Sequence, residues 1–415
     1  MPENAVTVGL ILPELTRSVA EEHLEELAKL VESAGGSVAA SVIAKRPSPD
    51  PATYIGKGKA EELKKIAAET GATLVVFDDD LSPAQVRNLE KITDAKVIDR
   101  SALILDIFAA RARTREARTQ VELAQLEYML PRLTRAWSHL ERQAGGIGTR
   151  GVGETQLELD RRIVRTRISR LKDELKKIEQ HRHTQRKARR RAFTVALVGY
   201  TNAGKSTLFN RLTQGHVEAV DKLFATLDAK SARIDAEMPR ETVIVDTVGF
   251  IRKLPHHLVA SFRSTMEEAV AAGLVLHVID QSHPLFEEQR AIGEEVLRDL
   301  GVDMSRVVEV YNKADRVDDA FHPHRKDSVS VSALTGRGIE KLIDELRRRE
   351  LEGGEMSQLA IPHGESRVAA RLHEVAEVYE QTENGESTLY TAWVPRDAMR
   401  EFAGYRVKLR TRKIG

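Results

Sequence analysis

Short apolar runs alternate with amphipathic stretches from residue 6 to about residue 110. Four runs, VTVGLIL, SVAASVIA, TLVVFD and KVID, have the length and composition of buried strands. Between the first two, SVAEEHLEELAKLVESAGG has the apolar spacing of a helix, a serine at its start and glycines at its end, and KAEELKKIAAETG repeats this arrangement. The alternation predicts a small α/β domain with a parallel sheet.

The pattern changes between residues 113 and 191, where two long helices are predicted. The first covers 114–143 and should bend or break near Pro131, because proline cannot donate a helical hydrogen bond. The second covers 154–191. Joined by a glycine-rich stretch, the two should form an antiparallel helical hairpin with facing apolar stripes. The stripe of the second helix comprises Leu157, Ile163 or Val164, Ile168, Leu171, Leu175 and Ile178.

Strands and helices alternate again from residue 192 to 351, with strands expected in FTVALVG, ETVIVD, LVLHVID, RVVEVYNK and DSVSVSA. After LEGGE, the tail predicts a helix over 365–383 and strands in STLYTAWV and YRVKLR. Four parts are therefore expected. They are an N-terminal α/β domain (1–112), a helical hairpin with a Gly-rich tip (113–191), a P-loop α/β domain (192–351) and a small C-terminal α+β domain (352–415).

Composition narrows the class of protein without revealing its function. The 415 residues include 64 Lys and Arg against 63 Asp and Glu, so only the distribution of charge is informative. The absence of cysteine excludes disulfides and thiolate metal sites. The N-terminal apolar run has no basic residues before it and is broken by Pro13, unlike a signal peptide. No apolar run approaches the roughly 18 residues that span a bilayer. A soluble, cytoplasmic protein is expected.

The stretch GYTNAGKS, between a predicted strand and a predicted helix, matches the phosphate-binding P-loop. Backbone N–H groups of such a loop and of the following helix bind phosphate oxygens. Lys205 is expected on the β- and γ-phosphates, and the Ser206 hydroxyl is expected to bind Mg²⁺. The nucleotide-binding residues expected here are Gly199, Tyr200, Thr201, Asn202, Ala203, Gly204, Lys205, Ser206 and Thr207.

Four further segments follow in the order that a GTPase needs. FATLD and DTVG are expected near the γ-phosphate and metal. In NKAD, the Asp315 carboxylate can accept hydrogen bonds from the N1–H and 2-amino groups of guanine, which adenine lacks, and SAL can offer a backbone N–H to guanine O6. The segments therefore predict a GTP site. Its residues here are Phe224, Ala225, Thr226, Leu227, Asp228, Asp246, Thr247, Val248, Gly249, Asn312, Lys313, Asp315, Ser332, Ala333 and Leu334.

The candidate catalytic residues are Lys205, Thr226 and Gly249, which would position and neutralise the phosphates. Thr226 joins Ser206 as a candidate Mg²⁺ ligand. Asp246 is expected to reach the outer coordination sphere of the ion.

Phe250 follows DTVG, where a Gln that orients the attacking water stands in some GTPases. A phenyl ring cannot hydrogen-bond water, so slow intrinsic hydrolysis is expected. It would be completed by a partner, a moved loop or a monovalent cation. Asn202 could help to hold K⁺ or could only stabilise the loop. No general base or arginine finger is evident, and Arg252 and Arg263 could both be surface groups.

The glycines of GGIGTRG raise the question of a dinucleotide site, because Gly146, Gly148 and Gly151 spell G-x-G-x-x-G. Such a site follows a strand, whereas this stretch follows a predicted helix and has no acidic ribose partner on a later strand. Two interpretations stay open. The stretch is either a flexible hairpin tip or a small-residue surface that carries Arg150 against a nucleic acid.

The helix that follows the glycines is strongly basic. Residues 158–191 contain fourteen Lys or Arg against five Asp or Glu, and Arg predominates, as suits phosphate recognition. We favour RNA contact over a merely solvated face, and RNA over DNA because no major-groove motif is visible. The candidate RNA-binding residues are Gly146, Gly148, Arg150, Gly151, Arg161, Arg162 and Arg165.

A second Gly–Lys stretch, YIGKGKAEEL, opens a predicted helix at residues 54–63. It could bind an anion or a second nucleotide, although an ordinary turn and helix start is the favoured interpretation. His181 and His183 lack a ligand set, so no metal site is predicted there.

Together these segments resemble the HflX family of GTPases over roughly residues 5–351. The resemblance rests on GKGK, GGIGTRGVGETQLELDRR, GYTNAGKSTLFN, LFATLD, DTVGFIRKLPHHLVASFRSTMEEA and NKAD. It implies a ribosome-associated, Mg²⁺-dependent GTPase that contacts the large subunit and its rRNA near the peptidyl-transferase region. It also implies a role in separating stalled or idle ribosomal subunits under stress.

The free protein is expected to be a monomer without a membrane span. Two other functions remain open. One is a GTPase in RNA modification or signalling without ribosome contact, and the other is an RNA-remodelling protein driven by ATP and GTP.

Overall fold

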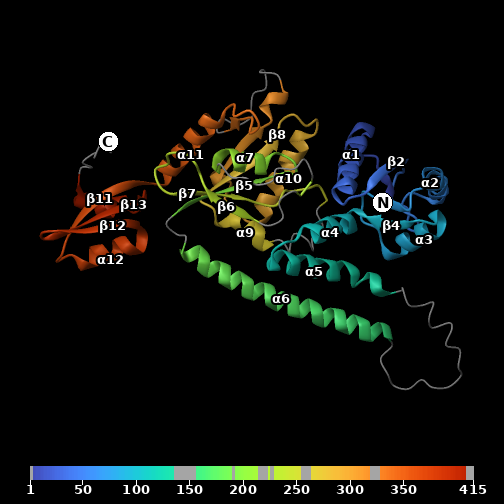
Figure 1. The fold of residues 1–415 in the computed structure, drawn as a ribbon, viewed down its shortest axis with the longest axis horizontal. Helices are drawn as coiled ribbons and strands as arrows, with labels where there is room; N and C mark the ends of the chain where they lie inside the picture. Colours follow the sequence, from blue (N-terminus) through green and yellow to red (C-terminus); the bar gives the residue numbers. More distant parts are fainter. Residues whose placement is uncertain are drawn as a thin grey trace.

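The computed structural model describes residues 3–134, 156–188, 192–213, 223–224, 229–253, 263–317 and 328–407. Its lobes lie in a row (Figure 1), with the N-terminal lobe at one end, the P-loop lobe in the middle and the C-terminal lobe at the other end. The long helix α6 (Gln156–Ala188) runs along one side of the row. None of the described helices is long and apolar enough to cross a membrane.

The N-terminal lobe contains a parallel four-stranded sheet of order β2-β1-β3-β4, as the alternating pattern predicts. Seven of the eight residues of β1 are buried, because the strand lies inside the sheet with helices packed on it. The lobe comprises β1 (Asn4–Ile11), α1 (Arg17–Ser33), β2 (Ser37–Lys45), α2 (Lys57–Thr70), β3 (Leu74–Phe77), α3 (Pro83–Thr93), β4 (Lys96–Asp99) and α4 (Arg100–Arg111).

Sequence periodicity does not single out α3 and α4. Helix α4 buries Leu103, Ile104, Leu105, Ile107 and Phe108, so apolar residues cover most of its circumference and no amphipathic stripe shows. Helix α3 is recognisable instead by its start, where a serine and a glutamine form a reciprocal capping box. The Gly–Lys stretch does open a helix, α2, which begins at Lys57.

Helices α5 (Arg115–Met129) and α6 pack against each other with opposite directions, and a short 3₁₀ turn, η1 (Arg132–Thr134), follows α5. The helix ends before Pro131, as expected. Ion pairs join Arg115 to Glu174 at 2.6 Å and Arg167 to Glu122 at 2.6 Å, which fixes the antiparallel register. Leu171 is buried but Ile163 is 58% exposed, so the half-buried Val164 continues the apolar stripe instead.

The P-loop lobe has a six-stranded sheet of order β10-β9-β8-β5-β7-β6, in which only β6 runs antiparallel to its neighbour. All seven residues of β8 are buried, as expected of a central strand covered on both faces. The strands are β5 (Phe193–Gly199), β6 (Lys230–Arg233), β7 (Thr242–Asp246), β8 (Leu274–Asp280), β9 (Val307–Asn312) and β10 (Val329–Ser330). The helices are α7 (Lys205–Thr213), α9 (Arg263–Ala271), α10 (Phe286–Asp299), α11 (Ile339–Gly353) and the short η2 (Met304–Arg306) and η3 (Ala314–Arg316).

The C-terminal lobe is an antiparallel sheet of order β12-β13-β11-β14 with one helix against it. The predicted helix over 365–383 is wrong beyond Val375. Residues 377–384 form a strand that pairs with β13 through a turn at Gly385, whose φ is +64°. Its elements are β11 (Gly354–Pro362), α12 (Ser366–Val375), β12 (Glu377–Asn384), β13 (Ser387–Pro395), η4 (Met399–Tyr405) and β14 (Arg406–Val407).

One arginine connects the C-terminal lobe to the P-loop lobe. Arg240 pairs with Glu350 at 2.9 Å and with Glu377 at 3.0 Å, and its guanidinium lies over the ring of Trp393, 4.6 Å from its centroid. The Glu350 side chain is completely buried. Burial raises the pKa of Glu350 to about 7, even though Arg240 acts in the opposite direction.

We predict that Glu350→Gln changes the pH dependence of stability. Because the folded pKa of Glu350 exceeds the ordinary value of 4.5, the folded wild type binds a proton that the unfolded chain has lost between about pH 4.5 and 7. Its contribution to stability therefore falls as pH rises through that window. Relative to wild type, E350Q should gain about 1–3 kcal/mol of unfolding free energy between about pH 5 and pH 8.

Urea unfolding of both proteins at the two pH values measures this difference. Glu352→Gln, which changes an exposed glutamate on the same helix, is the control and should follow wild type. Parallel stability curves for E350Q and wild type would contradict the assignment.

Candidate functional site

The P-loop connects the end of β5 to the start of α7 and depends on two glycines with positive φ. Gly199 has a φ of +144°, and a Cβ there would lie 2.1 Å from the Val278 carbonyl oxygen. Gly204 has a φ of +91°, and a Cβ there would lie 2.2 Å from Nδ2 of Asn312. Larger residues would therefore disrupt the loop on both conformational and steric grounds.

Lys205 is buried at the start of α7, with its ammonium directed back into the loop. Its Nζ donates to the carbonyl oxygens of Gly199 at 3.0 Å and Tyr200 at 2.8 Å. Burial lowers the pKa of Lys205 to about 8, while nearby Asp246 opposes that shift. A bound phosphate would favour the charged form further, because opposite charges attract strongly at a buried site.

Ser206 and Asp246 form the oxygen-rich part of the expected metal site, where the Ser206 hydroxyl donates to Oδ2 of the carboxylate at 2.8 Å. Hydroxyl and carboxylate oxygens are ligands that suit Mg²⁺, which also takes ligands from phosphates and water. These residues therefore fit the ion. Among the residues described, no group of three or more His, Asp or Glu could hold a metal without such additional ligands.

Several predicted site residues lie outside the described part of the chain. They are Ala225, Thr226, Leu227 and Asp228 of FATLD and Gly146, Gly148, Arg150 and Gly151 of the hairpin tip. Their expected roles stay predictions.

Gly249 lies against both the P-loop and Lys205. A Cβ at Gly249 would stand 2.8 Å from Nζ of Lys205 and 2.9 Å from Cα of Thr201. The next residue, Phe250, donates its N–H to the Gly199 carbonyl at 2.9 Å and accepts from the Thr201 N–H at 2.7 Å. The segment after β7 is therefore hydrogen-bonded to the P-loop, and a side chain at position 249 would prevent this contact.

The motifs expected at guanine meet at the ends of β9 and β10. Asn312 donates to the Ala203 carbonyl at 2.9 Å and accepts from the Ala333 N–H at 3.0 Å, so it joins the P-loop to the SAL segment. The Ser332 hydroxyl donates to Oδ1 of Asp315 at 2.5 Å, and this bond is the main reason that the pKa of Asp315 lies below its usual value.

The other predicted nucleotide-binding residues lie in different surroundings, some exposed or paired and some buried. Lys313 pairs with Asp280 at 2.6 Å, and Leu334 is 67% exposed. Thr247 donates its hydroxyl to the Leu197 carbonyl at 2.6 Å, and Val248 is buried in the core, so both side chains support the sheet. Phe224 is also buried, as the next contacts show.

The N-terminal lobe holds Leu223 and Phe224, at the start of LFATLD. The Leu223 carbonyl accepts from Arg111 at 2.6 Å, and its N–H donates to the Ser33 hydroxyl at 3.2 Å. Phe224 packs edge-on against Phe108, with ring centroids 4.6 Å apart. The Phe224 ring, expected among the nucleotide contacts, is therefore part of the interface between the lobes.

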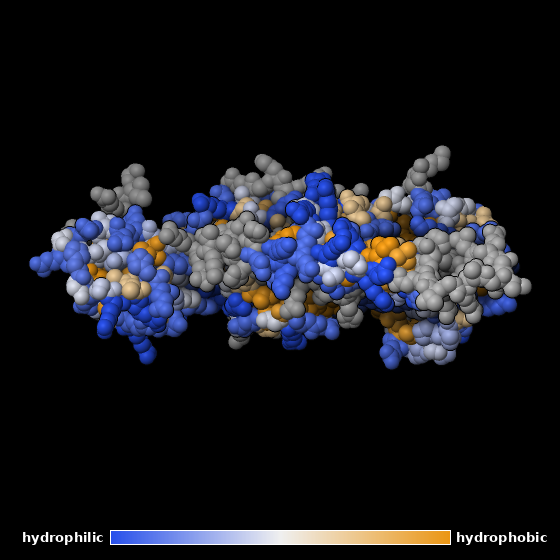
Figure 2. Space-filling view, turned by 90° about the horizontal axis from the view of Figure 1, so that it is seen from below, coloured by the Kyte–Doolittle hydropathy of each residue, from blue (hydrophilic) through white to orange (hydrophobic). Residues whose placement is uncertain are grey.

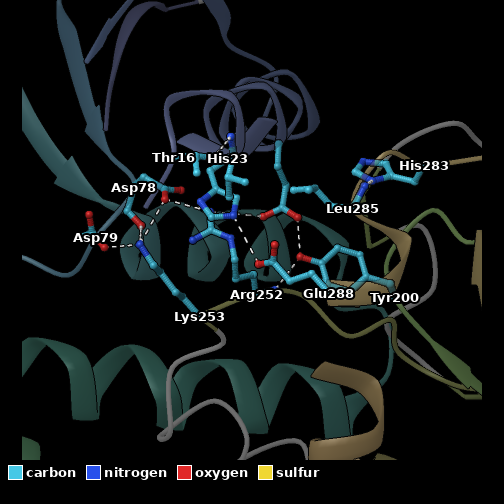
Figure 3. Close-up of polar contacts among 12 residues, drawn as sticks. Thr16, His23, Asp78, Asp79, Tyr200, Arg252, Lys253, His283, Leu285 and Glu288 are labelled. Atoms are coloured by element: carbon cyan, nitrogen blue, oxygen red, sulfur yellow. Dashed lines mark hydrogen bonds and ion pairs between the residues drawn. The ribbon is translucent and has the colours of Figure 1, made fainter. Parts of the chain in front are cut away.

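The same lobe also holds the residues that follow DTVG, as Figure 3 shows. Arg252 donates through Nη2 to Asp78 at 2.9 Å, and its N–H donates to the Tyr200 hydroxyl at 2.8 Å. Lys253 pairs with Asp79 and, at 3.3 Å, with Asp78. Arg252 is only 8% exposed, so the interpretation of it as a surface group is wrong.

A completely buried arginine completes this interface. Arg100 binds Asp78 at 2.7 Å, pairs with Glu26 and donates through Nε to the Arg252 carbonyl at 3.2 Å. Glu26 also accepts from the hydroxyl of Tyr200, within the P-loop. Sequence reasoning missed this cluster because hydrogen-bonded partners in it, such as Glu26 and Tyr200, lie 174 positions apart and no local pattern connects them.

We predict that Ser332 and Asp315 determine guanine preference. Removing the hydroxyl in Ser332→Ala frees the carboxylate to rotate and should weaken GDP binding about 5- to 30-fold, as expected for one lost hydrogen bond to a charged group. Asp315→Ala should remove most of the preference for GDP over ADP. Titration with fluorescent GDP and ADP analogues measures both effects.

Asp344→Ala, which changes an exposed aspartate on α11, is the control for loss of a carboxylate. A D315A variant that still strongly prefers GDP would show that the base lies elsewhere.

Three family models match consecutive parts of the chain. They are described as GTP-binding GTPase N-terminal (residues 21–109), GTP-binding GTPase Middle Region (111–189) and 50S ribosome-binding GTPase (194–313).

Individual proteins are similar over nearly the whole chain. The GTPase HflX of Magnetococcus marinus is 45% identical over 93% of this chain and 91% of its own, and that of Escherichia coli is 46% identical over 90% and 89%. A GTP-binding protein of Sulfolobus solfataricus, solved with GDP, is 26% identical over 84% of this chain and 98% of its own, with a TM-score of 0.45. With curated relatives this similar along almost its full length, the chain belongs to the HflX family, and it is a GTPase.

Proposed function

We propose that this GTPase acts on the large ribosomal subunit, that it separates or rescues stalled or idle ribosomes under stress, and that GTP hydrolysis releases it. The supporting observation is the basic helix α6, which lies beside α5 along one side of the lobes (Figure 1). Figure 2, which looks onto that side, shows mostly hydrophilic residues across the middle of the molecule.

Helix α6 carries more positive charge than α5 neutralises. Arg167 and Lys172 pair with glutamates of α5 at 2.6 and 2.8 Å. Further basic side chains of α6 are exposed, namely Arg162, Arg165, Arg170, Lys176 and Lys177, while Arg161 is half-buried. Exposed arginines in a row suit the phosphate backbone of RNA. The family description of residues 194–313 as a 50S ribosome-binding GTPase supports the same partner.

In the proposed reaction, water attacks the γ-phosphate in line with the departing GDP. Ser206 and Thr226 would hold Mg²⁺, with Asp246 in its outer coordination sphere, and the bound ion would supply positive charge to the phosphate oxygens. Lys205 would neutralise negative charge on the phosphates, and the Gly249 N–H would orient the γ-phosphate. Asn202, in the P-loop with a φ of +61°, is a candidate for holding K⁺ if a monovalent cation completes the site.

Nucleotide binding should reach the hairpin through the N-terminal lobe. Lys253 is four residues beyond Gly249 and pairs with Asp79, so a shift of Gly249 towards a γ-phosphate would strain this pair. We infer that the GTP-bound form tilts the lobes against each other and that the GDP-bound form keeps the contacts described.

We predict that Asp79→Asn favours the GTP-bound form. If the Lys253–Asp79 ion pair forms only in the GDP-bound form, a GTP analogue must break it in order to bind. The cost equals the free energy of the pair, about 0.5–1 kcal/mol for a partly exposed pair. D79N should therefore bind a non-hydrolysable GTP analogue about two- to fivefold more tightly, with unchanged GDP affinity. Lys253→Met should raise the affinity for the GTP analogue in the same way as D79N, and the double variant should bind it little more tightly than either single variant. Equal changes in both affinities would contradict the tilt.

The direct test of the function is phosphate release with and without purified large subunits. We expect strong stimulation by the subunits, and equal rates would contradict ribosomal activation. Arg162→Glu combined with Arg165→Glu should reduce co-sedimentation with large subunits at least tenfold in the presence of a GTP analogue at low salt. The difference from wild type should shrink at high salt, because a protein with fewer phosphate contacts has a weaker salt dependence.

The control for this charge reversal is Arg17→Glu combined with Arg367→Glu. It changes two exposed arginines away from the hairpin by the same charge and should bind like wild type.

The same measurements separate the alternatives. A GTPase of RNA modification or signalling would hydrolyse GTP but not co-sediment with ribosomes. An RNA-remodelling protein with ATP bound at the Gly–Lys stretch would retain ATPase activity after replacement of Lys205.

A cytoplasmic monomer is the form that we propose for the free protein.

A further inference from the structure

The side-chain hydroxyl of Thr201, in the P-loop, has no role among the expected nucleotide contacts. It is 5% exposed, and its Oγ1 is buried with no hydrogen-bond partner among the residues that the structure describes. Nearby hydroxyls differ, because Ser206 donates to Asp246 and Thr247 donates to Leu197. A hydroxyl can both donate and accept, and burying one without a partner is unfavourable. An unused hydroxyl within a binding loop therefore points to a ligand.

The position of Thr201 relates this hydroxyl to the terminal phosphate. Both Cα and Cγ2 of Thr201 would lie 2.9 Å from a Cβ at Gly249, and that same Cβ would lie 2.8 Å from Nζ of Lys205. Thr201 also donates its N–H to the Phe250 carbonyl at 2.7 Å. Thr201 thus lies where the P-loop, the lysine and the segment after DTVG meet, which is the γ-phosphate end of the expected site.

A cavity of about 60 Å³ adjoins this point and includes Thr201, Tyr200, Asn202, Arg252, Asp280 and His283 in its lining. A polar cavity of this volume has room for water. Nε of Arg252 is likewise buried without a hydrogen-bond partner among the described residues, so two of the residues in the lining have unused hydrogen-bonding capacity. Figure 3 shows the Arg252 side chain extending towards Asp78, while His283 lies on the other side of the cluster, near Tyr200.

We propose that the Thr201 hydroxyl holds the water that attacks the γ-phosphate, a task for which the Phe250 side chain has no suitable group. The hydroxyl accepts a hydrogen bond from the water and donates one to a γ-phosphate oxygen. The water oxygen bonds to the γ-phosphorus, and the bond from that phosphorus to the bridging oxygen breaks. One water proton stays on the attacking oxygen as the new P–OH group, the other passes to another oxygen of the released phosphate, and GDP leaves with the electron pair of the broken bond. Thr201 itself is unchanged.

The experiment compares intrinsic GTP hydrolysis by Thr201→Val, Thr201→Ser and wild type in the full chain, without ribosomes. It therefore depends on the GTPase activity alone and not on the ribosomal role. T201V keeps the shape but loses the hydroxyl, so kcat should fall about 10- to 100-fold while KM stays within about threefold, as for loss of one transition-state hydrogen bond. T201S keeps the hydroxyl and should retain kcat within about threefold of wild type.

Two further measurements separate this role from a structural one. GDP affinity should be the same in all three proteins, whereas the affinity for GDP with aluminium fluoride, which mimics the transferring phosphoryl group, should fall only in T201V. Thr213→Val, at the far end of α7 with its hydroxyl on the Phe209 carbonyl at 2.8 Å, is the matched control and should hydrolyse GTP like wild type.

The proposal is overturned if T201V retains wild-type kcat, or if KM alone changes. It is also overturned if T201S loses as much activity as T201V, because the methyl group and not the hydroxyl would then matter. Should T201V fail to bind GDP, the comparison of T201S with Thr201→Ala decides in the same way, since only the serine keeps the hydroxyl.

Discussion

The buried guanidinium of Arg100 holds the N-terminal lobe and the P-loop lobe in one arrangement. Burial alone would lower the pKa of Arg100, but Glu26 and Asp78 outweigh it and raise the pKa above its ordinary value. Burial likewise acts to raise the pKa of Asp78, and Arg100 and Arg252 outweigh it in the other direction. A buried charge that loses its partner costs about 3–5 kcal/mol, so these groups stabilise the interface only as a complete set.

This set of charges makes the N-terminal lobe part of the nucleotide site. The N-terminal lobe contacts the P-loop at the hydroxyl of Tyr200. It also contacts Leu223, before FATLD, and Arg252, after DTVG. Hydrophobic packing supports the polar contacts, because residues of both lobes belong to one continuous core. A change of conformation at the γ-phosphate therefore cannot leave the interface between the lobes unaffected.

The sequence predicts those features that depend on neighbouring residues. The strands of the first sheet, those of the second sheet except β6, the P-loop between β5 and α7, and the break before Pro131 follow from periodicity, glycine spacing and the chemistry of proline. The strand β12 does not, because its valine and tyrosine also continue the apolar spacing of the helix before it, and only pairing with β13 decides between helix and strand. The burial of Arg252 and of Phe224 depends on partners more than a hundred positions away. No local pattern carries such information.

The hairpin is connected to the nucleotide site through two adjacent residues. Asp99 is completely buried at the end of β4 and accepts from Tyr128 of α5 at 2.8 Å and from Arg132 at 2.9 Å, at the C-terminal end of the first hairpin helix. The next residue, Arg100, binds the carbonyl of Arg252 after DTVG. Because Asp99 and Arg100 are covalently joined and both side chains are held by several partners, neither contact can shift without displacing the other. A force on the hairpin from bound RNA and a shift of Gly249 caused by nucleotide would thus act on the same short segment, which gives the two events a direct structural connection.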